Sequence, residues 1–344
     1  MQLFKDMSET MELLTALQKG ILAADESHNT IAKRFAAINI ENTEENRRQY
    51  RELLFSTPHL EDHISGVILF EETFHQKTQN GQAFPEMLLE KGIVPGIKVD
   101  KGLIDLAGAV DEKITIGLDD LEERLIHFKK LGARFAKWRN VFSITDATPS
   151  PVAVRAGVET LARYAAICQK VGIVPIVEPE ILIDGDHSIM QCAGVSSHVL
   201  HSLFNALFEH HVHLELMILK TNMITSGKSH HPFSTPEEVA EYSLMVFMNH
   251  VPAAVGSINF LSGGQTPTQS TENLNAINEY GPHPWNISFS YGRALQDDCL
   301  KTWAGKEANK KSAQNALYQA CLQNGLACTG ELHEEAHEEH EHIH

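Results

Sequence analysis

One lysine lies in a segment that is otherwise uncharged. Lys220 belongs to residues 216–223, LMILKTNM, whose other side chains carry no formal charge. Lysine is rarely buried, so such a residue either extends its ammonium to water or is held for chemistry. Burial lowers a lysine pKa because desolvation disfavours the charged form, and a neutral amine attacks carbonyl carbons. The segment therefore indicates a candidate nucleophile, with a lysine that extends to solvent as the alternative.

Two further segments carry ionisable residues two positions apart. Lys137 and Arg139 lie in RFAKWRN, and Glu178 and Glu180 lie in IVPIVEPE. Residues i and i+2 of a β-strand face the same side, so these pairs would project two cations and two carboxylates in one direction. Carboxylates can transfer protons, and a nearby cation disfavours a protonated amine. A layer of salt bridges without a catalytic role is the alternative interpretation.

Glycines and cations at the ends of other segments indicate phosphate binding. Glycine lets backbone N–H groups approach phosphate oxygens, and arginine can donate two parallel hydrogen bonds. We expect one phosphate at the first set of residues, which is Ser262, Gly263, Gly264, Gly292 and Arg293. A second anion is expected at the second set, which is Ser27, Thr30, Lys98 and Arg139.

Eight apolar segments would position these residues, and polar residues follow most of them. They span residues 21–25, 66–72, 94–100, 134–140, 173–180, 216–223, 255–264 and 286–293. Helical patterns lie between them and begin at Thr43, Asp119, Pro151, Val195 and Thr235. In the last pattern, Thr235 and Glu238 predict a capping box and Pro236 occupies the first helical position. A further helix is expected from Ala304 to Gly325.

This alternation of strands and helices predicts an α/β fold. Eight buried parallel strands in one domain of this size favour a (β/α)8 TIM barrel, in which functional residues stand at the carboxyl ends of the strands. That rule adds Asp25, which ends the first segment, to the candidates. An open, doubly wound sheet is the alternative, but no GxGxxG motif follows the first segment.

Composition and net charge argue against several classes of function. The formal net charge of -17 over 344 residues argues against binding to nucleic acid or an anionic membrane. No apolar run is long enough to span a membrane, and the first residues do not resemble a signal peptide, so we expect a cytoplasmic protein. The five cysteines have no CxxC spacing and are expected to be reduced thiols. No metal site or cofactor is predicted.

The last residues differ from the rest. Residues 331–344, ELHEEAHEEHEHIH, contain six glutamates and no lysine or arginine. We therefore expect a barrel over residues 1–328 and an acidic, histidine-rich, disordered tail over residues 329–344. We expect the tail histidines to be solvated; binding of a divalent metal is the alternative.

Together, the candidate residues predict a particular reaction. An amine in a buried setting, carboxylates for proton transfer and two phosphate sites suit an enzyme that forms a Schiff base with a phosphorylated ketose. Such chemistry needs no metal.

The chain resembles the class I fructose-1,6-bisphosphate aldolases from about Lys19 to Cys328. The stretches that carry the resemblance are GILAADES, ENTEENRR, GVILFEETF, GIKVDKG, FAKWR, GIVPIVEPEIL, LKTNM, FLSGGQ and FSYGRALQ. It implies reversible cleavage of fructose 1,6-bisphosphate to dihydroxyacetone phosphate and glyceraldehyde 3-phosphate, in glycolysis and gluconeogenesis, by a homotetramer. A Schiff-base aldolase with another phosphoketose preference, or an added binding or scaffold role, are the alternatives.

The resemblance also implies roles for single residues. Lys220 would form the Schiff base, Glu178 would be the acid and base that removes water, and Asp25 would take the C4 hydroxyl proton. Lys137 would assist as a neighbouring cation and Glu180 would hold the network. The C1 phosphate would bind at the first set of residues. The sugar hydroxyls and the C6 phosphate would bind at the second set together with Arg34.

The chain departs from the family near the lysine and at its end. Leu214-Glu215-Leu216 stands where the family usually has Leu-Glu-Gly. Thr221 follows the lysine where the family commonly has proline, which restores an N–H, and we expect an effect on rate only. Many members end in a tyrosine that helps protonate the enamine, whereas this chain ends His342-Ile343-His344. We hypothesise that a tail histidine relays that proton.

Overall fold

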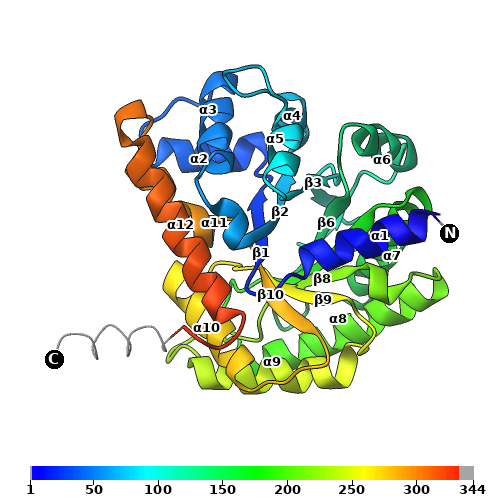
Figure 1. The fold of residues 1–344 in the computed structure, drawn as a ribbon. Coiled ribbons are helices and arrows are strands. Elements are labelled where there is room, and N and C mark those ends of the chain that lie inside the picture. The colour runs from blue at the N-terminus through cyan, green and yellow to red at the C-terminus, as the bar shows by residue number, and fades with distance from the viewer. Residues whose placement is uncertain (1, 333–344) are drawn as a thin grey trace.

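Eight parallel strands form a closed barrel. The computed structural model describes residues 2–332, and the tail from residue 333 onward lies outside the described residues. The order around the barrel is β1-β10-β9-β8-β7-β6-β3-β2 (Figure 1). The strands are β1 (Gly20–Ala24), β2 (Ile64–Leu69), β3 (Val94–Lys98), β6 (Phe135–Phe142), β7 (Val174–Ile181), β8 (Ile218–Thr221), β9 (Ser257–Phe260) and β10 (Asn286–Tyr291). Each predicted apolar segment overlaps one of them, and the predicted barrel is confirmed.

Helices surround the barrel (Figure 1). They are α1 (Gln2–Leu14), α2 (His28–Ala36), α3 (Glu44–Phe55), α4 (Glu71–His75), α5 (Phe84–Glu90), α6 (Leu121–Lys130), α7 (Pro151–Val171), α8 (Ile189–Glu209), α9 (Pro236–His250), α10 (Pro267–Glu279), α11 (Arg293–Trp303) and α12 (Lys310–Ala327). Single 3-10 turns are η1 (Leu60–Asp62), η2 (Leu214–Leu216) and η3 (Glu307–Asn309). A hairpin of β4 (Leu103–Asp105) and β5 (Lys113–Thr115) lies outside the barrel.

Several helix starts follow from capping residues. Thr43 accepts a hydrogen bond from the Asn46 N–H at the start of α3. At α9, Thr235 and Glu238 form the predicted capping box, with proline in the first turn. These side chains satisfy backbone N–H groups that have no partner within the helix.

Two predictions about helices were wrong. The helix expected from Val195 begins six residues earlier, because Ser188 and Gln191 form a capping box that the sequence analysis overlooked. The helix expected from Ala304 does not begin there: Ala304 has a φ of 46°, in the left-handed region, and ends α11, so α12 starts only at Lys310. Helix α2 was not predicted; Ser27 caps it and Thr30 lies in its first turn.

Helix α1 fills the barrel interior at the amino ends of the strands. Met7, Met11 and Leu14 of this helix form one buried cluster with residues at the amino ends of the strands, including Val94 and Phe135. Gly96 makes room for the Phe135 ring, since a Cβ there would lie 2.3 Å from it. A second, larger cluster packs the outer face of the strands against the helices. The amino end of the barrel is therefore closed by apolar side chains.

Candidate active site

Lys220 lies on β8 at the opposite, carboxyl end of the barrel. In register it is opposite Asn259 of β9, and its side chain is only 5% exposed. Its Nζ atom is 3.7 Å from Oε1 of Glu178, which comes from the neighbouring strand β7. The acid that its own segment lacks is thus supplied from the next strand. The lysine does not extend to solvent, which excludes that alternative.

Two more buried charged groups continue from Glu178. Lys137 of β6 has its Nζ 3.3 Å from Oε2 of Glu178, and it donates a hydrogen bond of 3.1 Å to Oδ2 of Asp25. Asp25 directly follows β1. The four groups alternate in sign, in the order Asp25, Lys137, Glu178 and Lys220, across the inside of the barrel. Neighbouring opposite charges allow a buried amine and a buried acid to exchange a proton over a short distance.

Burial and charge separate the two lysines. Burial lowers the pKa of Lys220, and the Lys137 ammonium lowers it further against the opposing effect of Glu178. Burial also opposes the charge on Lys137, but Asp25 and Glu178 outweigh it and raise the Lys137 pKa. Burial favours a neutral Asp25, yet Lys137 and Lys220 lower its pKa well below the ordinary value. Lys220 is therefore the amine that loses its proton more easily, while Lys137 and Asp25 stay charged.

Cations of the second predicted set already have carboxylate partners. Arg139 donates from Nε to Oε2 of Glu180, with its side chain 36% exposed. Lys98 lies 3.4 Å from Oδ1 of Asp100, and its Nζ faces the Phe70 ring at 5.8 Å. These residues stand on β6, β7 and β3, whose carboxyl ends are adjacent. They surround the mouth of the barrel next to the buried cluster.

The hydroxyls of this set stand at the start of α2. Ser27 accepts a hydrogen bond from the Thr30 N–H, and the two hydroxyl oxygens are 3.1 Å apart. Arg34, in the last turn of α2, pairs with Glu26. Its Nη2 atom is 3.9 Å from the point that a Cβ on Gly292 would occupy. Arg34 is therefore placed beside a glycine of the first predicted set.

The first set is brought together by β9 and β10. Ser262, Gly263 and Gly264 follow β9, and the two glycines have φ angles of 42° and 84°, in the left-handed region that favours glycine. Gly292 follows β10, and a Cβ there would lie 3.1 Å from the Ala23 carbonyl oxygen. Arg293 is exposed and begins α11. These three glycines therefore leave the backbone uncovered by their own side chains at the place where a phosphate would approach.

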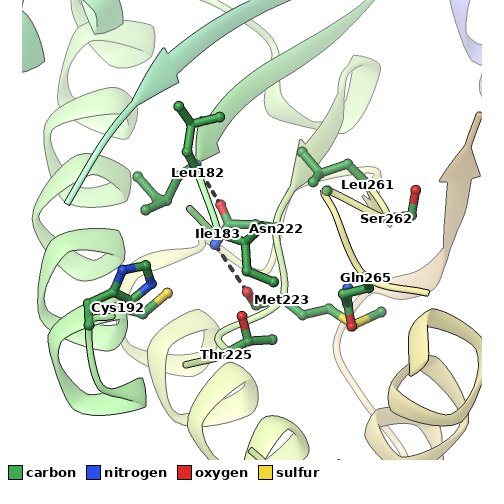
Figure 2. A pocket seen from close by; sticks show the side chains of 12 residues that line it. Leu182, Ile183, Cys192, Asn222, Met223, Thr225, Leu261, Ser262 and Gln265 are labelled. Carbon is green, nitrogen blue, oxygen red and sulfur yellow. Dashed lines mark hydrogen bonds between the residues drawn. The ribbon is translucent and has the colours of Figure 1, made fainter. Parts of the chain in front are cut away.

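A small cavity lies behind this glycine loop (Figure 2). Asn222 accepts a hydrogen bond from the Ile181 N–H at 2.9 Å and donates one to the Met223 carbonyl at 3.1 Å. The Thr221 carbonyl accepts from Leu261 N–H at 3.0 Å, which ties the chain after Lys220 to the loop. The cavity measures about 10 Å³, enough for one water molecule, so it is not the substrate site.

Sequence reasoning missed several polar residues of this end. Ser290 of β10 has a buried hydroxyl with no hydrogen-bond partner among the described residues. Asp100 and Glu26 each follow a strand and pair with a cation at the mouth. Their places two residues past a strand end could have identified them. The buried Arg51 of α3, which also pairs with Glu26, gave no such signal.

The barrel and its buried lysine and carboxylate cluster define a (β/α)8-barrel enzyme with a candidate amine nucleophile. A family model described as glycolytic, fructose-bisphosphate aldolase class-I, matches residues 6–344. The chain belongs to the class I fructose-bisphosphate aldolase family, and it is a lyase that cleaves fructose bisphosphate reversibly.

Relatives and a solved structure support this assignment. The chain is 51% identical to a probable fructose-bisphosphate aldolase class 1 of Xylella fastidiosa, over 95% of this chain and 98% of the relative. It is 50% identical to a fructose-bisphosphate aldolase of Schistosoma mansoni, over 95% and 91%. The aldolase of Plasmodium falciparum, solved in complex with TRAP and a small molecule inhibitor, superposes with a TM-score of 0.95 at 47% identity, covering 96% of each chain.

Proposed function

We propose that Lys220 forms the covalent intermediate of the aldol reaction. Its neutral amine adds to the C2 carbonyl of the ketose, giving a carbinolamine. Glu178 donates a proton to the C2 hydroxyl, water leaves, and an iminium forms. The observation that carries this proposal is the 3.7 Å separation between Lys220 Nζ and Glu178 Oε1 inside a buried, charge-balanced cluster.

Asp25 is suited to the bond-breaking step. As a carboxylate it takes the proton of the C4 hydroxyl; the C3–C4 bond breaks, its electron pair moves toward the iminium, and the aldehyde leaves. The remaining enamine is protonated at C3 and hydrolysed to dihydroxyacetone phosphate, which frees the amine. Lys137 supports both carboxylates because it lies within 3.3 Å of each. Glu180 fixes Arg139 at the mouth.

The two phosphates bind around the mouth, outside this cluster. The C1 phosphate binds at Ser262, Gly263, Gly264, Gly292 and Arg293. The C6 phosphate and the sugar hydroxyls bind at Ser27, Thr30, Lys98 and Arg139. Arg34 joins the substrate from the β10 side. This arrangement favours fructose 1,6-bisphosphate over ketose monophosphates, and comparison of the rates on both would detect another preference.

We further propose a cytoplasmic homotetramer that acts in glycolysis and gluconeogenesis. Relatives from Arabidopsis thaliana at about this identity are named cytosolic. Among the described residues, no helix is long and apolar enough to cross a membrane. Exposed apolar side chains on two faces would suit contacts between copies, namely Leu103, Ile104 and Val110 around the hairpin and Phe208 and Met248 on α8 and α9. Light scattering should give four times the chain mass of 38.3 kDa.

The proposed catalytic unit spans residues 1–328, with residues 329–344 as an appended tail. The start of this tail is fastened to the body, because Gln18 donates to Thr329 and Glu331, and the Leu332 N–H donates to Asn275. An added binding role for the remaining tail is the second candidate function. Pull-down with the tail alone against the tail-deleted chain would separate that role from catalysis.

Trapping the intermediate tests the proposed nucleophile. We expect borohydride reduction with dihydroxyacetone phosphate to add the triose phosphate to Lys220, as identified by peptide mass spectrometry. Prior treatment with EDTA should leave the yield unchanged. Lys220→Met should give no adduct, whereas Lys170→Met, at an exposed lysine paired with Glu122, should react normally. An adduct at any other lysine would refute the assignment.

A further inference from the structure

A buried carboxylate beside the site binds two arginines at once. Glu26 directly follows Asp25, and its side chain is 5% exposed. Its Oε2 atom accepts a hydrogen bond of 2.9 Å from Arg51 Nη2, and its Oε1 atom accepts one from Arg34 Nη1. Arg51 belongs to α3 and Arg34 to α2. Glu26 therefore connects two helices that pack outside the barrel with the end of strand β1.

Arg51, the more buried of the two arginines, has hydrogen-bond partners for only part of its guanidinium among the described residues. Arg51 is 2% exposed, and within residues 2–332 its Nε and Nη1 atoms have no hydrogen-bond partner. Its guanidinium carbon lies 5.8 Å from the centre of the Tyr50 ring. A buried ion pair with unpaired donors contributes little to stability, and apolar replacements of such pairs are often neutral. Stability alone is therefore a weak reason for an arginine at this position.

The outer arginine faces the mouth. The Arg34 side chain is 21% exposed, compared with 2% for Arg51. Its Nη2 atom, the one that does not bond Glu26, lies beside Gly292. Glu26 thus holds one nitrogen of Arg34 and leaves the other directed to the place where a substrate phosphate would bind.

We propose that Arg51 is a positioning residue for substrate binding and acts through Glu26 on Arg34. Its hydrogen bond holds the Glu26 carboxylate in place in the interior, and Glu26 in turn fixes the rotamer of Arg34. An arginine that is already ordered loses less conformational freedom when it binds a phosphate. This inference rests on the substrate-binding role proposed above for Arg34.

A double-mutant cycle tests the inference on the full chain. Arg34→Met and Arg51→Met should each raise the KM for fructose 1,6-bisphosphate about tenfold, the cost of one charge-assisted hydrogen bond, with kcat changed by less than about threefold. If Arg51 acts through Arg34, the double variant should be no worse than Arg34→Met alone. Arg51→Lys should recover most of the affinity because it restores the buried cation.

Arg48→Met is the matched control. Arg48 lies on the same helix but pairs with Glu45 and Glu52, away from Glu26, so its loss should leave KM unchanged. A KM at the wild-type value in Arg51→Met, or KM effects that multiply in the double variant, would overturn the proposal. If Arg51→Met does not fold, Glu26→Gln takes its place in the same cycle with the same criteria.

The outcomes also separate this inference from the proposed function. An unchanged KM in Arg34→Met would refute both the binding role of Arg34 and the inference that depends on it, while the trapping experiment at Lys220 would be unaffected. A raised KM in Arg34→Met alone, without an effect of Arg51→Met, would refute only the inference.

Discussion

The two ends of the barrel interior are built from the same strands but differ in every chemical respect. At the amino end, side chains such as Phe135 and Val94 pack against α1 and form an apolar cluster. At the carboxyl end, Asp25, Lys137, Glu178 and Lys220 form a buried ionic cluster. Apolar burial is favourable, whereas removing charges from water costs free energy. The comparison teaches that stability and chemistry are divided along the barrel axis.

The largest expected effect is on the chemistry of the carboxyl end. Lys220→Met should lower kcat at least about 10⁴-fold, since Lys137, the other lysine beside Glu178, has a raised pKa and keeps its proton. The melting temperature should stay the same or rise, because a buried amine is replaced by an apolar side chain. Steady-state kinetics and thermal unfolding check both parts. A large drop in melting temperature would show that the ionic cluster is needed to hold the barrel together.

The opposite result is expected at the amino end. Phe135 is fully buried, so Phe135→Ala should lower the free energy of unfolding by about 3–5 kcal/mol. The kcat per folded molecule should be close to wild type, because the side chain does not contact the ionic cluster. Denaturant titration and counting of active sites by trapping would measure the two quantities. A selective loss of kcat would refute the division.

A pH profile tests the electrostatics of the carboxyl end. Lys220 must be neutral to attack, so the rate of adduct formation should rise with pH and reach half its maximum below the ordinary lysine value of 10.5. Lys137→Met removes a positive charge that lowers the Lys220 pKa, and the midpoint should move to higher pH. Trapping rates with cyanoborohydride across the pH range measure this shift. A shift to lower pH would contradict the sign.

A smaller effect is expected at the mouth. Arg293→Ala should raise the KM for the bisphosphate about tenfold and change kcat less, because we propose that the arginine binds a phosphate that does not react. A matched surface change, Lys301→Ala, removes an exposed cation of the same helix that pairs with Asp297, and it should leave KM unchanged. Initial-rate kinetics distinguish the two variants.

The smallest effect concerns the tail. If a tail histidine relays the enamine proton, deletion of residues 333–344 should slow turnover of fructose 1,6-bisphosphate without lowering the yield of the Lys220 adduct. The described anchors at Thr329, Glu331 and Leu332 remain in that variant. Equal turnover with and without the tail would disprove the relay.

The sequence predicted inward-facing residues best on the strands, where successive side chains alternate between the two faces. Lys220, Glu178 and Lys137 face inward because alternate residues of a strand share a side, and parallel strands bring their carboxyl ends to one edge. That reasoning requires only the run of apolar residues and the place where it ends. The glycines that it proposed for phosphate binding follow β9 and β10 at the same edge.

Pairings between distant elements were beyond that reasoning. Arg51 is one of several arginines on a helix whose pattern predicts only an exposed face and a buried face. Its contact with Glu26 depends on how α3 packs beside α2, and sequence spacing does not determine that packing. Likewise, Arg34 was grouped with the second anion set, but α2 places it beside Gly292. The boundary of α8 was missed for a local reason, the overlooked box at Ser188.

Closure of the amino end by α1 bears on the sequence of events during turnover. Because the amino end is closed, the substrate must enter and both products must leave through the carboxyl end of the barrel. If the ketose is held on Lys220 as proposed, the half that remains attached cannot leave, so the free aldehyde has to leave first.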